Sequence, residues 1–241
     1  MVKKHYKPFQ FKQFSISQEH AAMKVGTDSI MLGSWATVKK TDKVLDIGTG
    51  TGLLSIMLSQ KVDGKCAIDA IEIDEEAIID AKLNLRNSPW PTSIKIQKIS
   101  LQEYQPANLY DLIICNPPFY MGKQSSDSAR NKARNAADSL DLITLLQKSS
   151  ALLRENGKLC IVIPSEIAEN SKHEAKKFNL QVSKIVNVRS KPIKPVNRTL
   201  LEFKKTSKAI ESIKNELCIE MENGSYSTEF KDLTRDFYLN F

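Results

Sequence analysis

Four consecutive residues, Asn116-Pro117-Pro118-Phe119, could hold a flat ring that carries an amino group. They follow an apolar run over residues 112–115, which is typical of a buried parallel strand. The motif is therefore expected at the carboxyl end of that strand, where open α/β sheets bind ligands. Its prolines fix φ and remove two N–H donors, so the loop is stiff and offers carbonyl acceptors. The amide could accept hydrogen bonds from an exocyclic amine and the aromatic ring could stack on it, although a plain proline-rich turn is the alternative.

A second group of candidate residues forms a glycine-rich turn, Asp46-x-Gly48-x-Gly50-x-Gly52, between an expected strand and an expected helix. Glycines there let the backbone approach a ligand closely, and a helix N-terminus favours anionic groups. The dinucleotide fingerprint has glycine at its sixth position, where this chain has Leu53, so an NAD-dependent oxidoreductase is disfavoured. Glu72 ends the next expected strand, where a carboxylate can accept both hydroxyls of an adenosine ribose. The alternative, a glycine-rich surface turn near an unrelated acid, does not explain this spacing.

The hydrophobic pattern predicts the scaffold that positions these residues. Expected strands cover residues 44–47, 67–73, 93–99, 112–115 and 159–163. Expected helices cover residues 53–58, 75–87 with Asp74 as N-cap, 139–154 with Asn156-Gly157 as the stop, and 165–178. Such alternation predicts a doubly wound, mostly parallel α/β sheet.

Two further strands are expected over residues 180–188 and 198–203. The link between them contains Pro192 and Pro195 and is too short for a crossover helix, so this last pair should be an antiparallel hairpin. The tail after residue 225 is rich in aromatic residues, and we expect it to pack back on the body.

Composition excludes several classes of protein. The chain has 241 residues, of which 41% are hydrophobic and 26% charged, as in one globular α/β domain with short additions. No apolar run approaches the ~18 residues of a membrane span. Four dispersed cysteines without a Cys-x-x-Cys pair, and three histidines, argue against a zinc site or a disulfide framework. Residues 1–6 lack the apolar core of a signal peptide, so we expect a cytoplasmic protein with no metal and no membrane partner.

The net charge of +7 is unevenly distributed. Residues 1–24 contain five lysines and one glutamate, whereas residues 42–116 contain seven basic and eleven acidic residues. Residues 172–208 contain nine lysines and two arginines against two glutamates. A neutral-to-acidic centre with basic flanks predicts a small-molecule site whose surroundings face a polyanion such as nucleic acid. A lysine-rich genome composition is the alternative explanation.

Together, these motifs resemble a known family. The glycine turn and Glu72 are similar to the S-adenosylmethionine site of class I methyltransferases, and Asn116-Pro117-Pro118-Phe119 resembles the amino-group methyltransferase motif of that fold. Residues 11–14 and 23–35 resemble the N-terminal part of the bacterial valine-tRNA adenine-N6 methyltransferases, as do residues 198–203 and 233–238. The resemblance spans nearly the whole chain. It implies a Rossmann-like sheet of seven strands, mostly parallel, whose final pair is antiparallel.

The resemblance also implies S-adenosyl-L-methionine as the cofactor. Residues 1–40 would be an N-terminal segment that caps it, packed on a methyltransferase domain over residues 41–241 that includes the hairpin and the aromatic tail. Cofactor-binding candidates are Lys24, Thr27, Asp28, Asp46, Gly48, Gly50, Gly52, Glu72 and Ser100. Ser100 stands where many relatives carry an aspartate. Thr27 and Asp28 could also serve as the N-cap of a helix expected over residues 29–35.

The implied reaction transfers a methyl group to the exocyclic N6 of an adenine in tRNA, in the anticodon loop of a valine tRNA. Positive charge develops on the nitrogen during attack. The side-chain oxygen of Asn116 and the carbonyl of Pro117 would accept its N–H bonds and stabilise that charge. Pro118 would keep the loop rigid, and Phe119 would stack on the base after it leaves its own stack. Candidate RNA-binding residues are Tyr120, Lys123, Arg130, Lys132, Arg134, Lys191 and Lys194.

Several alternatives remain open from the sequence. Related enzymes with the same motif methylate a guanine N2 in ribosomal RNA. Others methylate a glutamine in a protein, but their motif usually ends in tyrosine, where this chain has Phe119. A non-catalytic RNA-binding module would leave the glycine turn and Asn116 unexplained. The basic loop over residues 121–135 is either a lid that contacts phosphates or a solvated loop, and the sequence does not specify an oligomeric state or a target nucleotide.

Overall fold

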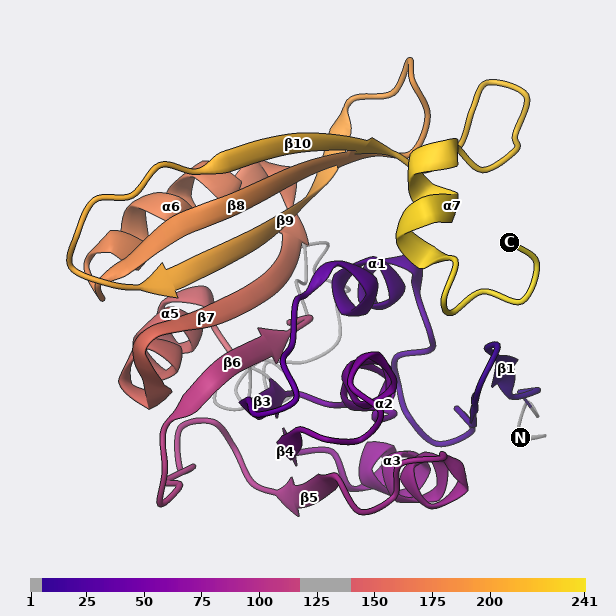
Figure 1. Cartoon of the computed structure of the whole chain (residues 1–241), viewed down its shortest axis with the longest axis horizontal. Coiled ribbons are helices and arrows are strands. Elements are labelled where there is room, and N and C mark those ends of the chain that lie inside the picture. Colours follow the sequence, from indigo (N-terminus) through magenta and orange to yellow (C-terminus); the bar gives the residue numbers. More distant parts are fainter. Residues whose placement is uncertain (1–5, 118–139) are drawn as a thin grey trace, which may run out of the picture.

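A mostly parallel sheet runs through the molecule (Figure 1). The structure, a computed structural model, describes residues 6–117 and 140–241. Within these residues the main sheet has eight strands in the order β10-β8-β9-β7-β6-β3-β4-β5. The strands are β3 (Lys43–Ile47), β4 (Ala67–Glu72), β5 (Ile94–Lys98), β6 (Tyr110–Cys115), β7 (Leu153–Pro164), β8 (Leu180–Arg189), β9 (Val196–Lys205) and β10 (Ile213–Cys218).

Strand direction confirms the predicted α/β class. Only β9 runs against its neighbours β7 and β8, and the other pairs in the sheet of the described residues are parallel. The predicted antiparallel hairpin is therefore present as β8 and β9. The eighth strand, β10, is a departure from the expected seven and pairs in parallel with β8 at the sheet edge. Its first four residues are exposed, so the sequence lacks the apolar pattern by which a strand is recognised.

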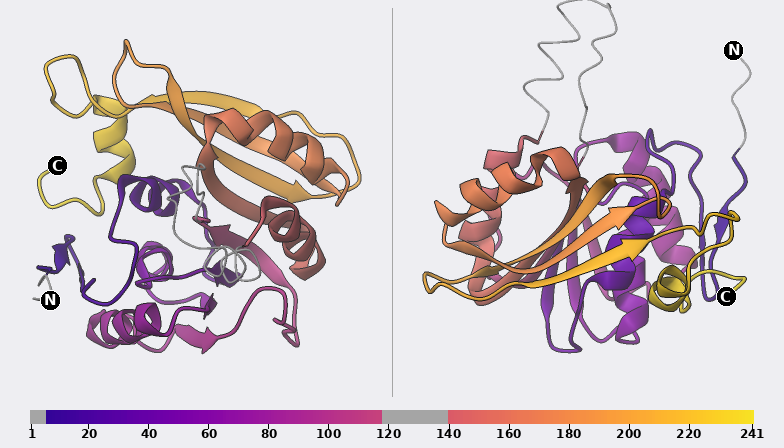
Figure 2. Two further views of the ribbon diagram at one scale, coloured as in Figure 1. Left: turned by 180° about the vertical axis from the view of Figure 1, so that it is seen from behind. Right: turned by 90° about the horizontal axis from the view of Figure 1, so that it is seen from above.

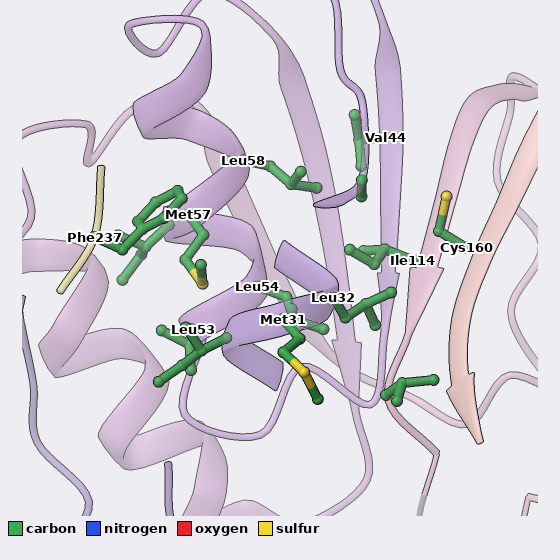
Figure 3. Packing of buried hydrophobic residues seen from close by; sticks show 14 of the residues in the cluster. Met31, Leu32, Val44, Leu53, Leu54, Met57, Leu58, Ile114, Cys160 and Phe237 are labelled. Carbon is green, nitrogen blue, oxygen red and sulfur yellow. The ribbon is translucent and has the colours of Figure 1, made fainter. Parts of the chain in front are cut away.

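Helices cover both faces of the sheet (Figures 1 and 2). On one face lie α1 (Thr27–Trp35), α2 (Leu53–Lys61), α3 (Glu75–Asn87) and α7 (Thr228–Thr234), and on the other lie α5 (Leu142–Leu152) and α6 (Ala168–Lys176), which follows the short 3-10 turn η1 (Ser165–Ile167). Successive strand residues point to opposite faces, so Val44 and Leu45 belong to different hydrophobic clusters. Figure 3 shows the first cluster, in which α1 and α2 pack against β3 and β6.

The helix ends test three details of the sequence prediction. Asp74 caps α3 as expected, because its side chain accepts a hydrogen bond from the N–H of Glu76 at 3.0 Å. The expected N-cap at Thr27 and Asp28 is wrong, since α1 already begins at Thr27 and its N-cap is Gly26, which has no side chain to contribute. Both side chains are thereby free for other contacts.

The stop expected at Asn156-Gly157 is also wrong, because α5 ends at Leu152. The ammonium group of Lys205 donates to the carbonyls of Ser150 (2.6 Å) and Leu153 (2.9 Å), which closes the helix end early. Gly157 instead lies within β7 at a tight bend, where a Cβ atom would stand 2.9 Å from the carbonyl oxygen of Arg154.

The N-terminal segment and the aromatic tail lie side by side on the body (Figure 1). A two-stranded ribbon, β1 (Phe9–Gln10) and β2 (Ser15–Ile16), introduces the buried Phe11 and Phe14 into the first hydrophobic cluster. Phe230 and Phe237 of the tail are buried in the same cluster. The prediction that the tail packs back on the body is confirmed.

Candidate active site

A cavity of about 580 Å³ opens at the carboxyl ends of β3, β4 and β6. Cavities of this size are typical of small-molecule sites. Its walls come from segments far apart in the sequence: residues 21–29, the glycine turn after β3, the ends of β4 and β6, and the loop after β5. Eight of the candidate residues lie in these walls, namely Lys24, Thr27, Asp28, Gly48, Gly50, Glu72, Asn116 and Pro117.

The glycine turn shapes one wall of the cavity, and four of its N–H groups are already paired. Gly48 has a φ of +66°, and a Cβ atom built there would meet no atom within 4 Å, so it would occupy the space of the cavity. The N–H groups of Gly48 and Thr49 donate to the carbonyl of Ile71, that of Gly50 donates to Glu72, and that of Gly52 to Thr49. Because these four N–H groups are already paired, they are not available to a phosphate, which agrees with the departure from the dinucleotide fingerprint at Leu53.

Asp46 lies beneath the turn and is fully buried. One oxygen, Oδ2, accepts hydrogen bonds from the hydroxyls of Thr49 (2.6 Å) and Ser55 (2.7 Å) and from the N–H of Ser55 (3.2 Å). Burial raises the pKa of this carboxyl to about 6, although these donors oppose the rise. The other oxygen, Oδ1, has no partner in the part of the chain that the structure describes. Asp46 does not line the cavity and braces the turn from below.

Glu72 is held rigidly at the end of β4. Its Oε2 accepts from the N–H of Gly50 at 2.9 Å, and its Oε1 accepts from the N–H groups of Ile73 (2.8 Å) and Asp74 (3.0 Å). A carboxylate oxygen has two lone pairs, so Oε2 can accept a further hydrogen bond from a ligand hydroxyl. Beside it, Ile73 is 48% exposed and lines the cavity, which offers apolar surface that a flat ring would cover.

Asn116 and Pro117 follow β6, which β3 separates from β4, and they line the cavity from that side. The amide nitrogen of Asn116 donates to the hydroxyl of Ser29 on α1 at 2.8 Å. Its oxygen is not used in this contact and can accept a hydrogen bond from a ligand. The candidates Pro118, Phe119, Tyr120, Lys123, Arg130, Lys132 and Arg134, and the loop 121–135, lie outside the described residues.

Residues 21–29 form the wall that faces the glycine turn. The ammonium group of Lys24 donates to the carbonyls of Gln18 (2.6 Å) and Ala21 (2.8 Å), so it closes the loop that carries it. Asp28 accepts a hydrogen bond from Nε of Arg198 at 2.8 Å, which joins α1 to the start of β9.

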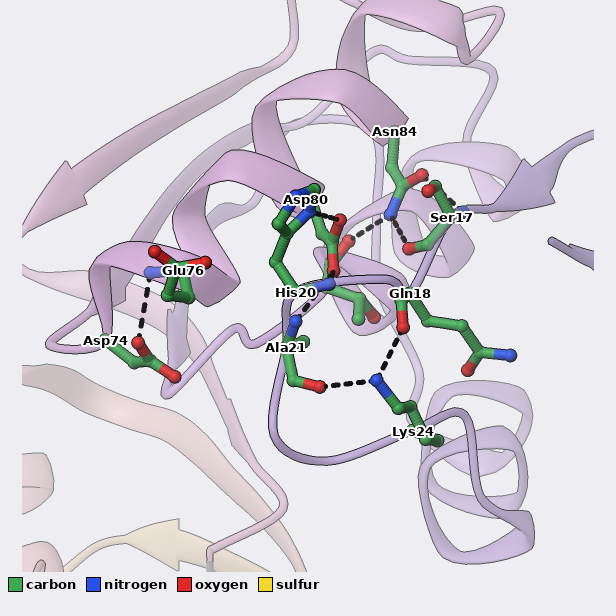
Figure 4. Close-up of polar contacts among 10 residues, drawn as sticks. Ser17, Gln18, His20, Ala21, Lys24, Asp74, Glu76, Asp80 and Asn84 are labelled. Atoms are coloured by element: carbon green, nitrogen blue, oxygen red, sulfur yellow. Dashed lines mark hydrogen bonds and ion pairs between the residues drawn. The ribbon is translucent and has the colours of Figure 1, made fainter. Parts of the chain in front are cut away.

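Two buried side chains of α3 anchor this wall (Figure 4). Asp80 accepts from the N–H groups of His20 and Ala21, both at 2.8 Å, and its Oδ1 lies 2.9 Å from Nδ1 of His20. Burial raises the pKa of Asp80, but these donors outweigh it and the pKa is lowered. The side-chain oxygen of Asn84 accepts from the N–H of Ser17, and its NH₂ group donates to the carbonyls of Ser17 and Thr51. The sequence analysis did not identify this pair, whose signal is two polar residues four apart beside the apolar positions of an amphipathic helix.

Five candidate residues do not line the cavity. Asp46 and Gly52 support the turn, and Gly52 is the N-cap of α2 with a φ of +82°. Ser100 forms a local turn with Glu103, while its neighbours Leu101 and Gln102 line the cavity in its place. Lys191 and Lys194 belong to the β8–β9 link.

The structure also bears on metals and membranes. Among residues 6–117 and 140–241, no group of three or more histidine, cysteine, aspartate or glutamate side chains could hold a metal ion. Over the same residues, no helix is long and apolar enough to cross a membrane.

Known proteins share both the sequence and the fold. Residues 20–187 match the methyltransferase small domain family. A tRNA1(Val) (adenine(37)-N6)-methyltransferase of Bacteroides thetaiotaomicron is 40% identical over 233 residues, which covers 96% of this chain and 97% of the relative. The protein of the same name from Christiangramia forsetii is 41% identical, with 96% and 98% covered.

Solved structures share the fold at low sequence identity. A predicted O-methyltransferase of Agrobacterium tumefaciens has a TM-score of 0.70 at 15% identity and covers 87% of this chain and 96% of its own. A putative RNA methyltransferase of Pyrococcus horikoshii has a TM-score of 0.51 at 16% identity, with 68% and 75% covered.

Proposed function

The chain belongs to the family of tRNA1(Val) (adenine(37)-N6)-methyltransferases, and on this premise we propose that it transfers a methyl group from S-adenosyl-L-methionine to N6 of an adenine in the anticodon loop of a valine tRNA. The observation that carries the proposal is one cavity in which the glycine turn, Glu72 and Asn116-Pro117 meet. A tRNA-modifying enzyme works where tRNA is, so we place it in the cytoplasm.

The cavity suits the cofactor in shape and in its polar groups. Glu72 presents a fixed carboxylate to the ribose hydroxyls, and Ile73 and Leu101 offer apolar surface to the adenine ring. The open space at Gly48 lets a ligand approach the backbone of the turn closely. Because N–H groups of the turn are already paired, the part of the ligand that lies there needs no phosphate. When bound, the cofactor supplies an electrophilic methyl group on a sulfonium centre. Residues 1–40 then act as the segment that caps it, through the wall at Lys24, Thr27 and Asp28.

Asn116 and Pro117 hold the adenine N6 nitrogen, which accepts the methyl group. The Asn116 oxygen and the Pro117 carbonyl accept the two N–H bonds of the amine and stabilise the positive charge that develops on it. This arrangement needs no strong base before methyl transfer, because the proton can leave afterwards. Holding the nitrogen in line with the methyl group supplies much of the remaining rate. Pro118 and Phe119 complete the motif as loop support and stacking partner.

The test is a labelled-methyl assay with defined substrates. The purified protein is incubated with labelled S-adenosylmethionine and an unmodified valine tRNA transcript, and the product is digested to nucleosides for mass spectrometry. We expect N6-methyladenosine in the anticodon loop. A second valine transcript, with guanine in place of the adenine, should accept no label. Parallel reactions contain ribosomal RNA or cell protein in place of the transcript. Label found only in a ribosomal RNA guanine or in a protein glutamine would contradict the proposed substrate while leaving methyl transfer intact.

A further inference from the structure

The side-chain amide of Asn116 makes a hydrogen bond to a residue on helix α1. Its Nδ2 atom lies 2.8 Å from the hydroxyl oxygen of Ser29, and both residues line the cavity. Ser29 is the third residue of α1, and 87 positions separate it from Asn116 in the sequence. This contact is not local to the motif, so it depends on where α1 lies.

The direction of this hydrogen bond decides which end of the amide faces the ligand. An amide has a carbonyl oxygen that only accepts and an NH₂ group that only donates. With Nδ2 on Ser29, the oxygen of Asn116 faces the cavity and can accept from an amine. If the amide were turned by 180°, its NH₂ group would meet the N–H donors of the substrate and no hydrogen bond to the amine would form. A serine hydroxyl can donate as well as accept, so Ser29 can hold either end of the amide, and the substrate amine, which needs an acceptor, selects the orientation with the oxygen toward the cavity.

Helix α1 is well placed to hold Ser29 still. At its C-terminal end, the ammonium group of Lys61 donates to the carbonyls of Gly33 (3.2 Å), Ser34 (2.5 Å) and Ala36 (2.5 Å). At its N-terminal end, Asp28 is paired with Arg198. In between, α1 packs so closely on α2 that a Cβ atom at Gly33 would lie 2.6 Å from the sulfur of Met57. The hydroxyl of Ser29 is therefore presented by a helix that is fixed at both ends.

We infer that Ser29 is a positioning residue for methyl transfer: it holds one end of the Asn116 amide in place, so that the other end faces the cavity and its oxygen accepts from the substrate amine. The inference rests on the proposed function, because it needs an acceptor with N–H donors. Ser29 acts through Asn116 and does not itself touch the reacting atoms. Its loss should therefore affect turnover and leave cofactor binding intact.

Ser29→Ala tests this directly. We expect kcat on the tRNA transcript to fall about tenfold, as the loss of one orienting hydrogen bond predicts, while the Kd for S-adenosylmethionine stays within about twofold of the wild-type value. Ser29→Thr keeps the hydroxyl and should recover most of kcat. The matched control is Ser171→Ala, which removes a hydroxyl of α6 that donates to the carbonyl of Ile167 at the end of η1, outside the cavity, and should leave kcat unchanged.

A double-mutant cycle tests whether Ser29 acts through Asn116. In Asn116→Ala the side chain that Ser29 holds is absent, so adding Ser29→Ala should change the remaining kcat by less than about twofold. Unchanged kcat in Ser29→Ala alone would overturn the inference, as would a parallel loss of kcat and cofactor affinity. A wild-type protein that makes no N6-methyladenosine would instead contradict the proposed function, so the two failures are distinguishable.

Discussion

At the scale of single residues, Asn116 is the group on which turnover should depend most. Its oxygen accepts from the amine only as charge develops, so Asn116→Ala should lower kcat by about 10²-fold or more. Cofactor affinity should change little, because Asn116 follows β6, whereas Glu72, which would hold the ribose, ends β4 on the other side of β3. Asn215→Ala on the exposed edge strand β10 is the matched control. Equal losses of kcat and of cofactor affinity, measured by isothermal titration, would show that Asn116 is a structural residue instead.

The buried carboxyl of Asp46 should make the stability of the protein depend on pH. Its pKa is about 6 in the fold against 3.8 in the unfolded chain, so the folded state binds more protons between these values. The contribution of this group to stability is therefore present below about pH 4 and is lost as pH rises through 6. Relative to Asp46→Asn, the wild-type free energy of unfolding should fall by about 3 kcal/mol from about pH 4 to pH 7. Urea denaturation at a series of pH values measures it, and a constant difference would contradict it.

The sequence analysis identified cavity residues where they belong to a recognisable motif, as Glu72 and Asn116 do. Ser29 could not, because its role depends on a contact with a residue 87 positions away. Ser100 was a candidate by position alone, and its hydroxyl instead bonds Glu103 in a local turn. The motifs thus identified residues that line the cavity, whereas the residues that hold them in place depend on tertiary packing.

At the scale of elements, α3 should control the wall of residues 21–29. Asp80→Ala leaves two backbone N–H groups and the His20 ring without their acceptor, which should lower the free energy of unfolding by about 1–3 kcal/mol. Because the anchored segment lines the cavity, cofactor affinity should fall about tenfold. Glu75→Ala on the same helix removes only an exposed ion pair with Lys98 and should change neither quantity. If Asp80→Ala lowers stability but leaves cofactor affinity normal, the contacts of α3 with residues 21–29 do not affect cofactor binding.

The sequence predicted elements well where burial is regular and poorly where it is not. Strands β3, β4 and β6 lie in the sheet interior and have clear apolar runs. In contrast, β10 at the edge exposes Ile213 and most of its polar residues, so its pattern resembles that of a loop. The end of α5 is set by Lys205, a residue that the local sequence around Leu152 cannot reveal.

At the scale of the whole molecule, charge should govern RNA affinity and leave cofactor affinity unaffected. The lysine-rich segments 1–24 and 172–208 flank an acidic-to-neutral centre that contains the cavity. Binding to tRNA should release counterions, so the logarithm of the association constant should fall linearly with the logarithm of salt concentration. The Kd for S-adenosylmethionine should stay nearly constant over the same range, and fluorescence anisotropy with labelled tRNA measures the first quantity.

The β8–β9 link offers a paired test of that surface. Lys194 is exposed, whereas the ammonium group of Lys191 lies 3.7 Å from the carboxylate of Glu220 and is partly neutralised. If the link contacts phosphates, Lys194→Ala should reduce the magnitude of the salt slope by about one, as expected for one lost phosphate contact. Lys191→Ala should reduce it less, because its charge is already shared with Glu220. Slopes that match the wild type in both variants would exclude the link as a phosphate contact, and the RNA surface would then have to lie on other basic residues of the chain.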